Sequence, residues 1–183
     1  MNFLRKALLI VARSAVSIMS SAQISKLSQR MEIATVEVNY NTSEETIGIF
    51  KIPQEGTNQY YLSLGHVGIG DKDIQIDIDP LSELFIPLGS TLEESQNTMQ
   101  ELFDLYKSEP ETTIEKQGCL AILLPNDKLE PVKVTYRKVL LSRMLEFVLE
   151  RDGYDRAVFI QKSDFGSLFS SFKFYRKLHK KEQ

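Results

Sequence analysis

Apolar and polar residues alternate along the chain after residue 31, at the spacing of a β-strand. In this stretch the apolar positions are Ala34, Val36, Val38 and Tyr40. Because successive side chains of a strand point to opposite faces of a sheet, the pattern predicts a half-buried strand. Turn residues at 41–44 lead to a returning strand over 46–52, and a further strand is expected at 60–64. Such short connections favour antiparallel pairing.

At residue 90 the apolar spacing changes to three and four, which is the period of a helix. Ser90 or Thr91 is placed to cap the helix N-terminus, with Glu93 or Glu94 completing a capping box. The apolar stripe that follows consists of Leu92, Met99, Leu102, Phe103 and Tyr106. It predicts a helix over 91–107 that ends before Pro110.

The rest of the chain mixes both periods. Strands are expected at 119–124, 132–136 and 154–160, and helices at 139–148 and from Ser163 to the C-terminus. Strands that come first, followed by alternating helices and strands, predict an α+β fold. We expect a mainly antiparallel sheet with two or three helices packed on one face, plus an N-terminal amphipathic helix or a cleaved targeting segment.

Residues 1–30 contain three Arg and two Lys but no acid. This segment fits a secretory signal peptide with a cleavage site after Ala22, although Arg13 interrupts its apolar run. It also fits an organellar presequence, or a retained amphipathic helix that packs on the domain, on a partner or on a membrane surface. We therefore divide the chain into a targeting segment or helical arm at 1–30 and a single α+β domain at 31–183. The expected location is secreted or periplasmic, with organellar (mitochondrial) import or a retained N-terminus on a cytoplasmic protein as alternatives.

The composition excludes several classes of site. The chain has 183 residues, a formal net charge of −3 and one cysteine. A single cysteine forms no internal disulfide and no cysteine-based zinc cluster. An acidic chain is a poor binder of the nucleic-acid backbone, so no nucleic-acid partner is expected. No cofactor motif, catalytic signature or metal-ligand spacing stands out, so we predict no cofactor, no catalytic residue and no metal ligand.

Three features between 65 and 119 resemble sites but are better explained by structure. Four aspartates at 71–79 suggest a calcium site, yet a strand spreads them too far apart to close on one ion, and a solvated strand face is expected instead. The glycine-rich stretch at 65–70 lacks phosphate-loop spacing, which predicts a bulged turn around His66. Cys119 lies in an apolar run and is expected to be a small core residue.

The C-terminal segment combines aromatic residues with cations in an otherwise acidic chain. Its apolar positions predict a helix that covers the sheet, and cations near a helix C-terminus also stabilise the helix dipole. A docking surface for an anionic partner is the other interpretation. The candidate partner-binding residues are Lys173, Arg176, Lys177, Lys180 and Lys181.

These observations favour a non-catalytic interaction or assembly module, exported or organellar, with a protein partner. Peripheral membrane contact through the N-terminal segment is a further possibility. The alternative is a small hydrolase or lyase whose Asp, Glu, Tyr or Ser residues meet only in the folded protein. A calcium-stabilised domain is a third hypothesis.

Overall fold

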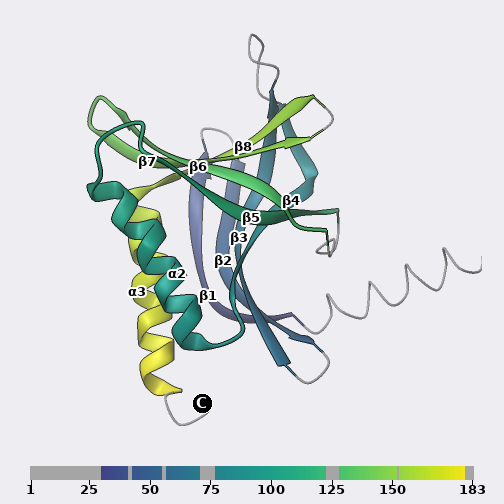
Figure 1. The fold of residues 1–183 in the computed structure, drawn as a ribbon, viewed down its shortest axis with the longest axis vertical. Coiled ribbons are helices and arrows are strands. Elements are labelled where there is room, and N and C mark those ends of the chain that lie inside the picture. The colour runs from purple at the N-terminus through teal and green to yellow at the C-terminus, as the bar shows by residue number, and fades with distance from the viewer. Residues whose placement is uncertain are drawn as a thin grey trace, which may run out of the picture.

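The chain folds into one antiparallel eight-stranded sheet with two helices, so the structure is mostly β (Figure 1). It is a computed structural model that describes residues 30–40, 43–54, 57–70, 77–122, 128–151 and 153–179. The elements in chain order are β1 (Met31–Tyr40), β2 (Ser43–Gln54), β3 (Thr57–Gly70), β4 (Asp77–Gly89), α2 (Leu92–Asp104), the 3₁₀ turn η1 (Leu105–Lys107), β5 (Thr113–Ile122), β6 (Glu130–Val139), β7 (Ser142–Arg151), β8 (Tyr154–Gln161) and α3 (Lys162–Leu178). The chain thus contains two consecutive units of four strands followed by a helix, β1 to α2 and β5 to α3.

Every strand pairs with the next one along the chain. The short connections predicted this for the first strands, whereas β4 and β5 pair although α2 lies between them in the chain. A further pairing joins β3 to β8, so that β3 to β8 close into a ring of hydrogen-bonded neighbours. The long strand β3 takes part in both halves because its register shifts on either side of His66, next to Gly65 with a φ of 73°. The bulge predicted at this place lies inside a strand that continues to Gly70, and it is not a turn.

The two helices lie side by side along one side of the sheet (Figure 1), where α2 contacts β4 and α3 contacts β1. Their buried residues include Met99, Leu102, Phe165, Leu168 and Phe172, which join the inward side chains of all eight strands in one core. The apolar stripes predicted for both helices are therefore the surfaces that they bury. Neither described helix is long and apolar enough to span a bilayer.

The N-terminus of α2 is capped as its sequence predicted. The Thr91 hydroxyl accepts a hydrogen bond from the backbone N–H of Glu94 at 3.1 Å. The Glu94 carboxylate accepts one from the backbone N–H of Ser90 at 2.8 Å and one from its hydroxyl at 3.0 Å. These bonds, the backbone one first, lower the pKa of Glu94 because they favour the charged form.

The prediction of a helix over 139–148 is wrong. Residues Leu140 and Leu141 form a two-residue turn, and β7 follows at once. Apolar residues at 144, 145, 147 and 148 match a helical spacing, but β7 lies between β6 and β8 and buries only every second residue, Leu145, Phe147 and Leu149. Pairing with two neighbouring strands satisfies the backbone hydrogen bonds that a helix would have made internally.

Residues 1–29 and 180–183 lie outside the described part of the chain. The predicted targeting segment or amphipathic arm falls almost entirely on the first of these stretches, so it stays a prediction. Residues 71–76 of the aspartate-rich stretch at 71–79 also lie outside the described residues. Asp77 and Asp79, the last two aspartates of that stretch, belong to β4.

Candidate functional site

The β6–β7 hairpin ends in an apolar tip that faces solvent. Val139 and Ser142 are the last paired residues, and only Leu140 and Leu141 connect the two strands. The exposed fractions are 55% for Val139, 90% for Leu140 and 99% for Leu141. In Figure 1 this hairpin projects at the upper left, beyond the end of α2. Single exposed apolar residues are ordinary on a protein surface, but three consecutive ones at the end of a projecting hairpin form a small apolar surface.

The backbone of this tip is strained. Leu140 has a φ of 55°, in the left-handed region that a bulky side chain rarely adopts. Two-residue hairpin turns usually place Gly, Asn or Asp at such a position, because these residues adopt a positive φ at little cost. A leucine there costs about 1–2 kcal/mol. The hairpin therefore presents an exposed leucine where the fold itself would prefer glycine.

Two cations lie two residues behind the leucines on the paired strands. Lys138 and Arg143 face each other across the hairpin, and both are exposed. Neither forms an ion pair with another described residue, and residues 138–143 contain no acid. Like charges directly opposite each other on paired strands destabilise a sheet. We name residues 138–143 the hairpin tip.

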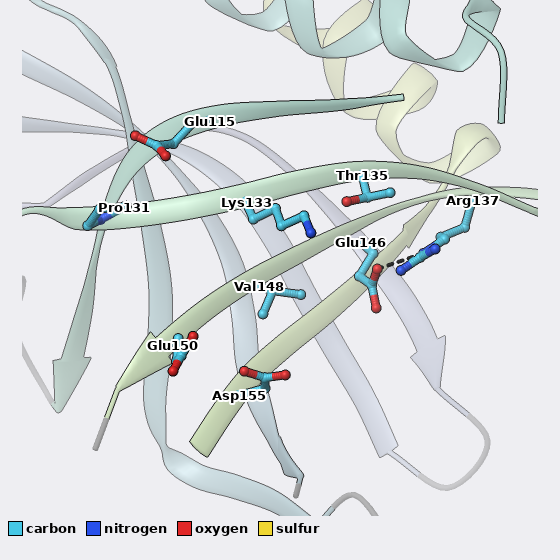
Figure 2. Close-up of a pocket in the computed structure, with 9 residues that line it drawn as sticks. All are labelled: Glu115, Pro131, Lys133, Thr135, Arg137, Glu146, Val148, Glu150 and Asp155. Atoms are coloured by element: carbon cyan, nitrogen blue, oxygen red, sulfur yellow. Dashed lines mark hydrogen bonds and ion pairs between the residues drawn. The ribbon is translucent and has the colours of Figure 1, made fainter. Parts of the chain in front are cut away.

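The outward face of the same hairpin carries a polar groove of about 390 Å³ (Figure 2). Outward residues alternate with core residues along β6 and β7, and the neighbouring strands β5 and β8 complete the lining. The lining residues are Glu115, Pro131, Lys133, Thr135, Arg137, Glu146, Val148, Glu150 and Asp155. The groove extends to Arg137, one residue before the hairpin tip on β6, and the Lys138 side chain points to the other face of the strand.

Ion pairs lie at the end of the groove nearest the tip. Arg137 Nε donates to Glu146 Oε2 at 2.7 Å (Figure 2), and its Nη1 donates to the carboxylate of Glu111. At the other end, Glu150 and Asp155 are register partners on β7 and β8. Neither forms an ion pair with another described residue. These carboxylates are able to accept hydrogen bonds from a cationic or hydroxyl-bearing ligand.

Two of the predicted cationic residues take part in contacts within the fold. Arg176 Nη1 donates to Gln96 Oε1 at 2.6 Å and so ties α3 to α2. Lys173 Nζ lies 3.8 Å from the centroid of the Phe169 ring, as a cation–π contact. Lys177 is exposed, whereas Lys180 and Lys181 lie outside the described residues. Partner binding by this set stays a prediction.

The other residues singled out from the sequence lie apart from the groove and the tip. His66 Nδ1 is 2.8 Å from Glu45 Oε2, between β3 and β2. Cys119 is buried against Phe85, as expected of a small core residue. Within the described ranges, no group of three or more His, Cys, Asp or Glu residues is arranged to hold a metal ion.

Sequence reasoning missed both the hairpin tip and the groove. The apolar spacing at 139–148 predicts a helix through the tip, although the sequence also shows a pair of leucines between two strand-like runs. The groove combines residues of four strands, and its local signal in the sequence is the alternation of polar residues at 133, 135 and 137. No protein-family model, curated protein or solved structure matches this chain.

Proposed function

We propose that this protein is a non-catalytic interaction module that docks on its partner through the hairpin tip. One observation supports the proposal above all others: Leu140 and Leu141 are 90% and 99% exposed at the end of a strained two-residue turn. Strain of this kind persists where the surrounding structure imposes it, and it concentrates at sites that bind or switch.

Three features of the tip are unfavourable for the isolated fold. Leucine side chains lie in water, a bulky residue holds a positive φ, and two cations oppose each other across paired strands. A partner that covers the leucines and neutralises the cations converts two of these costs into binding energy. Full burial of one leucine is worth about 1.5–3 kcal/mol. The tip is therefore better suited to a complex than to the free protein.

Delivery to the partner is the role that we assign to residues 1–30, as part of the same proposal. The absence of acids there supports export or organellar import. Mass spectrometry of the N-terminus of the native protein tests this part. A start at Gln23 indicates secretion, a start near Glu32 indicates organellar processing, and an intact Met1 rules out cleavage.

Photo-crosslinking in the producing cells tests the docking role. A benzophenone amino acid replaces Leu141 in the full chain, and the control carries it at Phe174, which is 63% exposed on α3. We expect an adduct from position 141 whose yield exceeds that from position 174. Equal yields at the two positions, or no adduct from either, contradict docking through the tip.

The groove supports a second candidate, the small hydrolase or lyase. Glu150 and Asp155 are opposed carboxylates at the end of a concave surface, and general acid–base catalysis needs groups of this type within reach of a substrate. Hydrolysis of ester, phosphate and glycoside model substrates by the wild type, and its loss in Glu150→Gln and Asp155→Asn, would establish this alternative. Turnover that persists in both variants would contradict it.

A further inference from the structure

We propose that the partner covering the hairpin tip is the surface of an anionic phospholipid bilayer. This inference rests on the proposed function and adds the chemistry of the partner. Leu140 and Leu141 enter the boundary between headgroups and acyl chains, while Lys138 and Arg143 contact lipid phosphates.

The spacing along the hairpin matches the layers of a bilayer. Lys138 precedes Leu140 by two residues and Arg143 follows Leu141 by two, which places the cations about 7 Å behind the apex at the rise of an antiparallel strand. The polar headgroup region adds about 5–7 Å to each side of the hydrocarbon core. With the leucines at the hydrocarbon edge, both cations therefore lie at the level of the phosphates.

The charge distribution around the tip also favours an anionic surface. The chain as a whole is acidic, yet residues 138–143 carry two cations and no acid. Two carboxylates behind the tip, those of Glu111 and Glu146, are both paired with Arg137. Lys138 and Arg143 attract the phosphates of an approaching anionic surface, and the repulsion between these two cations falls when phosphates lie between them.

The small size of the tip favours a lipid surface over a protein pocket. A stable protein interface buries about 800 Å² on each partner and uses about 20–30 residues, whereas the tip has far fewer. Membrane binding scales with the apolar area inserted plus the attraction to anionic lipids, and it needs no preformed pocket. A convex apex of two leucines with cations behind it meets this requirement.

Tryptophan fluorescence tests the proposal directly, because the chain contains no Trp. Leu141→Trp in the full chain places a single fluorophore at the apex. The matched control, Phe174→Trp, places one at an exposed position on α3. We expect a blue shift of the Leu141→Trp emission, and quenching by brominated lipid, with vesicles of mixed phosphatidylcholine and phosphatidylglycerol. No shift at position 141, or an equal shift at both positions, overturns the proposal.

Charge variants in the Leu141→Trp background test the role of the two cations. Lys138→Gln together with Arg143→Gln should weaken binding to the mixed vesicles about 30-fold, since each cation near an anionic membrane contributes about 1 kcal/mol. Lys128→Gln removes an exposed cation that precedes β6, at the end of the hairpin opposite the tip, and should leave the affinity unchanged. An equal loss from Lys128→Gln would show general charge attraction and overturn docking by the tip.

The two proposals fail in different ways. A protein adduct from position 141 without vesicle binding overturns the lipid partner and leaves docking through the tip standing. Absence of both the adduct and the vesicle binding removes the proposed function as well. Lipid adducts together with vesicle binding support both.

Discussion

Replacement of Leu140 by glycine should stabilise the protein, although it removes a large apolar side chain. The substitution releases the strain of a positive φ, which costs a non-glycine residue about 1–2 kcal/mol. Two effects oppose this gain. Glycine has more conformational freedom in the unfolded chain, which lowers the free energy of unfolding by about 0.5–1 kcal/mol. Loss of the small buried part of a leucine that is 90% exposed lowers it by about a further 0.2–0.3 kcal/mol. The expected net gain is about 0.5 kcal/mol.

Leu140→Ala is the matched control for this prediction. Alanine removes nearly the same apolar surface but keeps the Cβ that makes a positive φ unfavourable. We expect its free energy of unfolding to lie within about 0.5 kcal/mol of the wild type. The glycine variant should then exceed the alanine variant by about 0.5–1 kcal/mol.

Urea unfolding of the full chain, followed by circular dichroism, measures these differences. The slope of free energy against urea concentration should stay the same for all three proteins, because the surface exposed on unfolding hardly changes. A glycine variant no more stable than the alanine variant would refute the assignment of backbone strain to Leu140. A gain in stability combined with loss of vesicle binding would show that the tip trades stability for function.

Three further measurements test the packing and electrostatics of the fold. Gly118→Ala should destabilise the protein by about 1–3 kcal/mol in urea unfolding, because the new Cβ would lie 2.6 Å from a methyl group of β6. Gly166→Ala in α3 is the control: its closest contact would be an ordinary 3.6 Å, and it should stabilise by about 0.5–1 kcal/mol. Equal effects of the two substitutions would contradict this packing. Tyr106→Phe removes a buried 2.9 Å hydrogen bond to a carbonyl of β8 and should cost about 1–2 kcal/mol, and an unchanged unfolding midpoint would argue against that bond. Because the pKa of Glu94 is lowered, its carboxylate stabilises the fold above the ordinary glutamate pKa, and this stabilisation is lost as the pH falls through the lowered value. The difference in unfolding free energy between wild type and Glu94→Gln should therefore be largest at neutral pH and vanish in acid. A difference that grows in acid would contradict the lowered pKa.

The location of the apolar tip also bears on the role of residues 1–30. If the tip docks on a bilayer, an N-terminal amphipathic helix retained on the protein supplies a second membrane contact, and two weak contacts on one chain bind more tightly than either alone. N-terminal mass spectrometry and the vesicle measurements are therefore best made on the same preparation. An intact Met1 predicts stronger vesicle binding by the full chain than by a chain that begins at Gln23.

Local patterns determined much of the fold. The alternation at 34–40 predicted the strand β1, and the capping residues at 90–94 with their apolar stripe predicted α2. These predictions succeeded because a helix and a half-buried strand each repeat their buried positions at a characteristic period. The same reasoning identified Cys119 as a core residue, since its neighbours in sequence are also its surroundings in the core.

Tertiary structure decided the rest, because the deciding interactions join residues far apart in sequence. The apolar residues at 139–148 fit two periods, and pairing of β7 with β6 and β8 selected the strand. Gly68 pairs with Ala157 to close the sheet, and the groove assembles Glu115 and Asp155 from opposite ends of the second half. The hairpin tip depends on both sequence and tertiary structure. The sequence supplies its two leucines, but only the register of β6 and β7 places them at an exposed turn, where Leu140 has a positive φ.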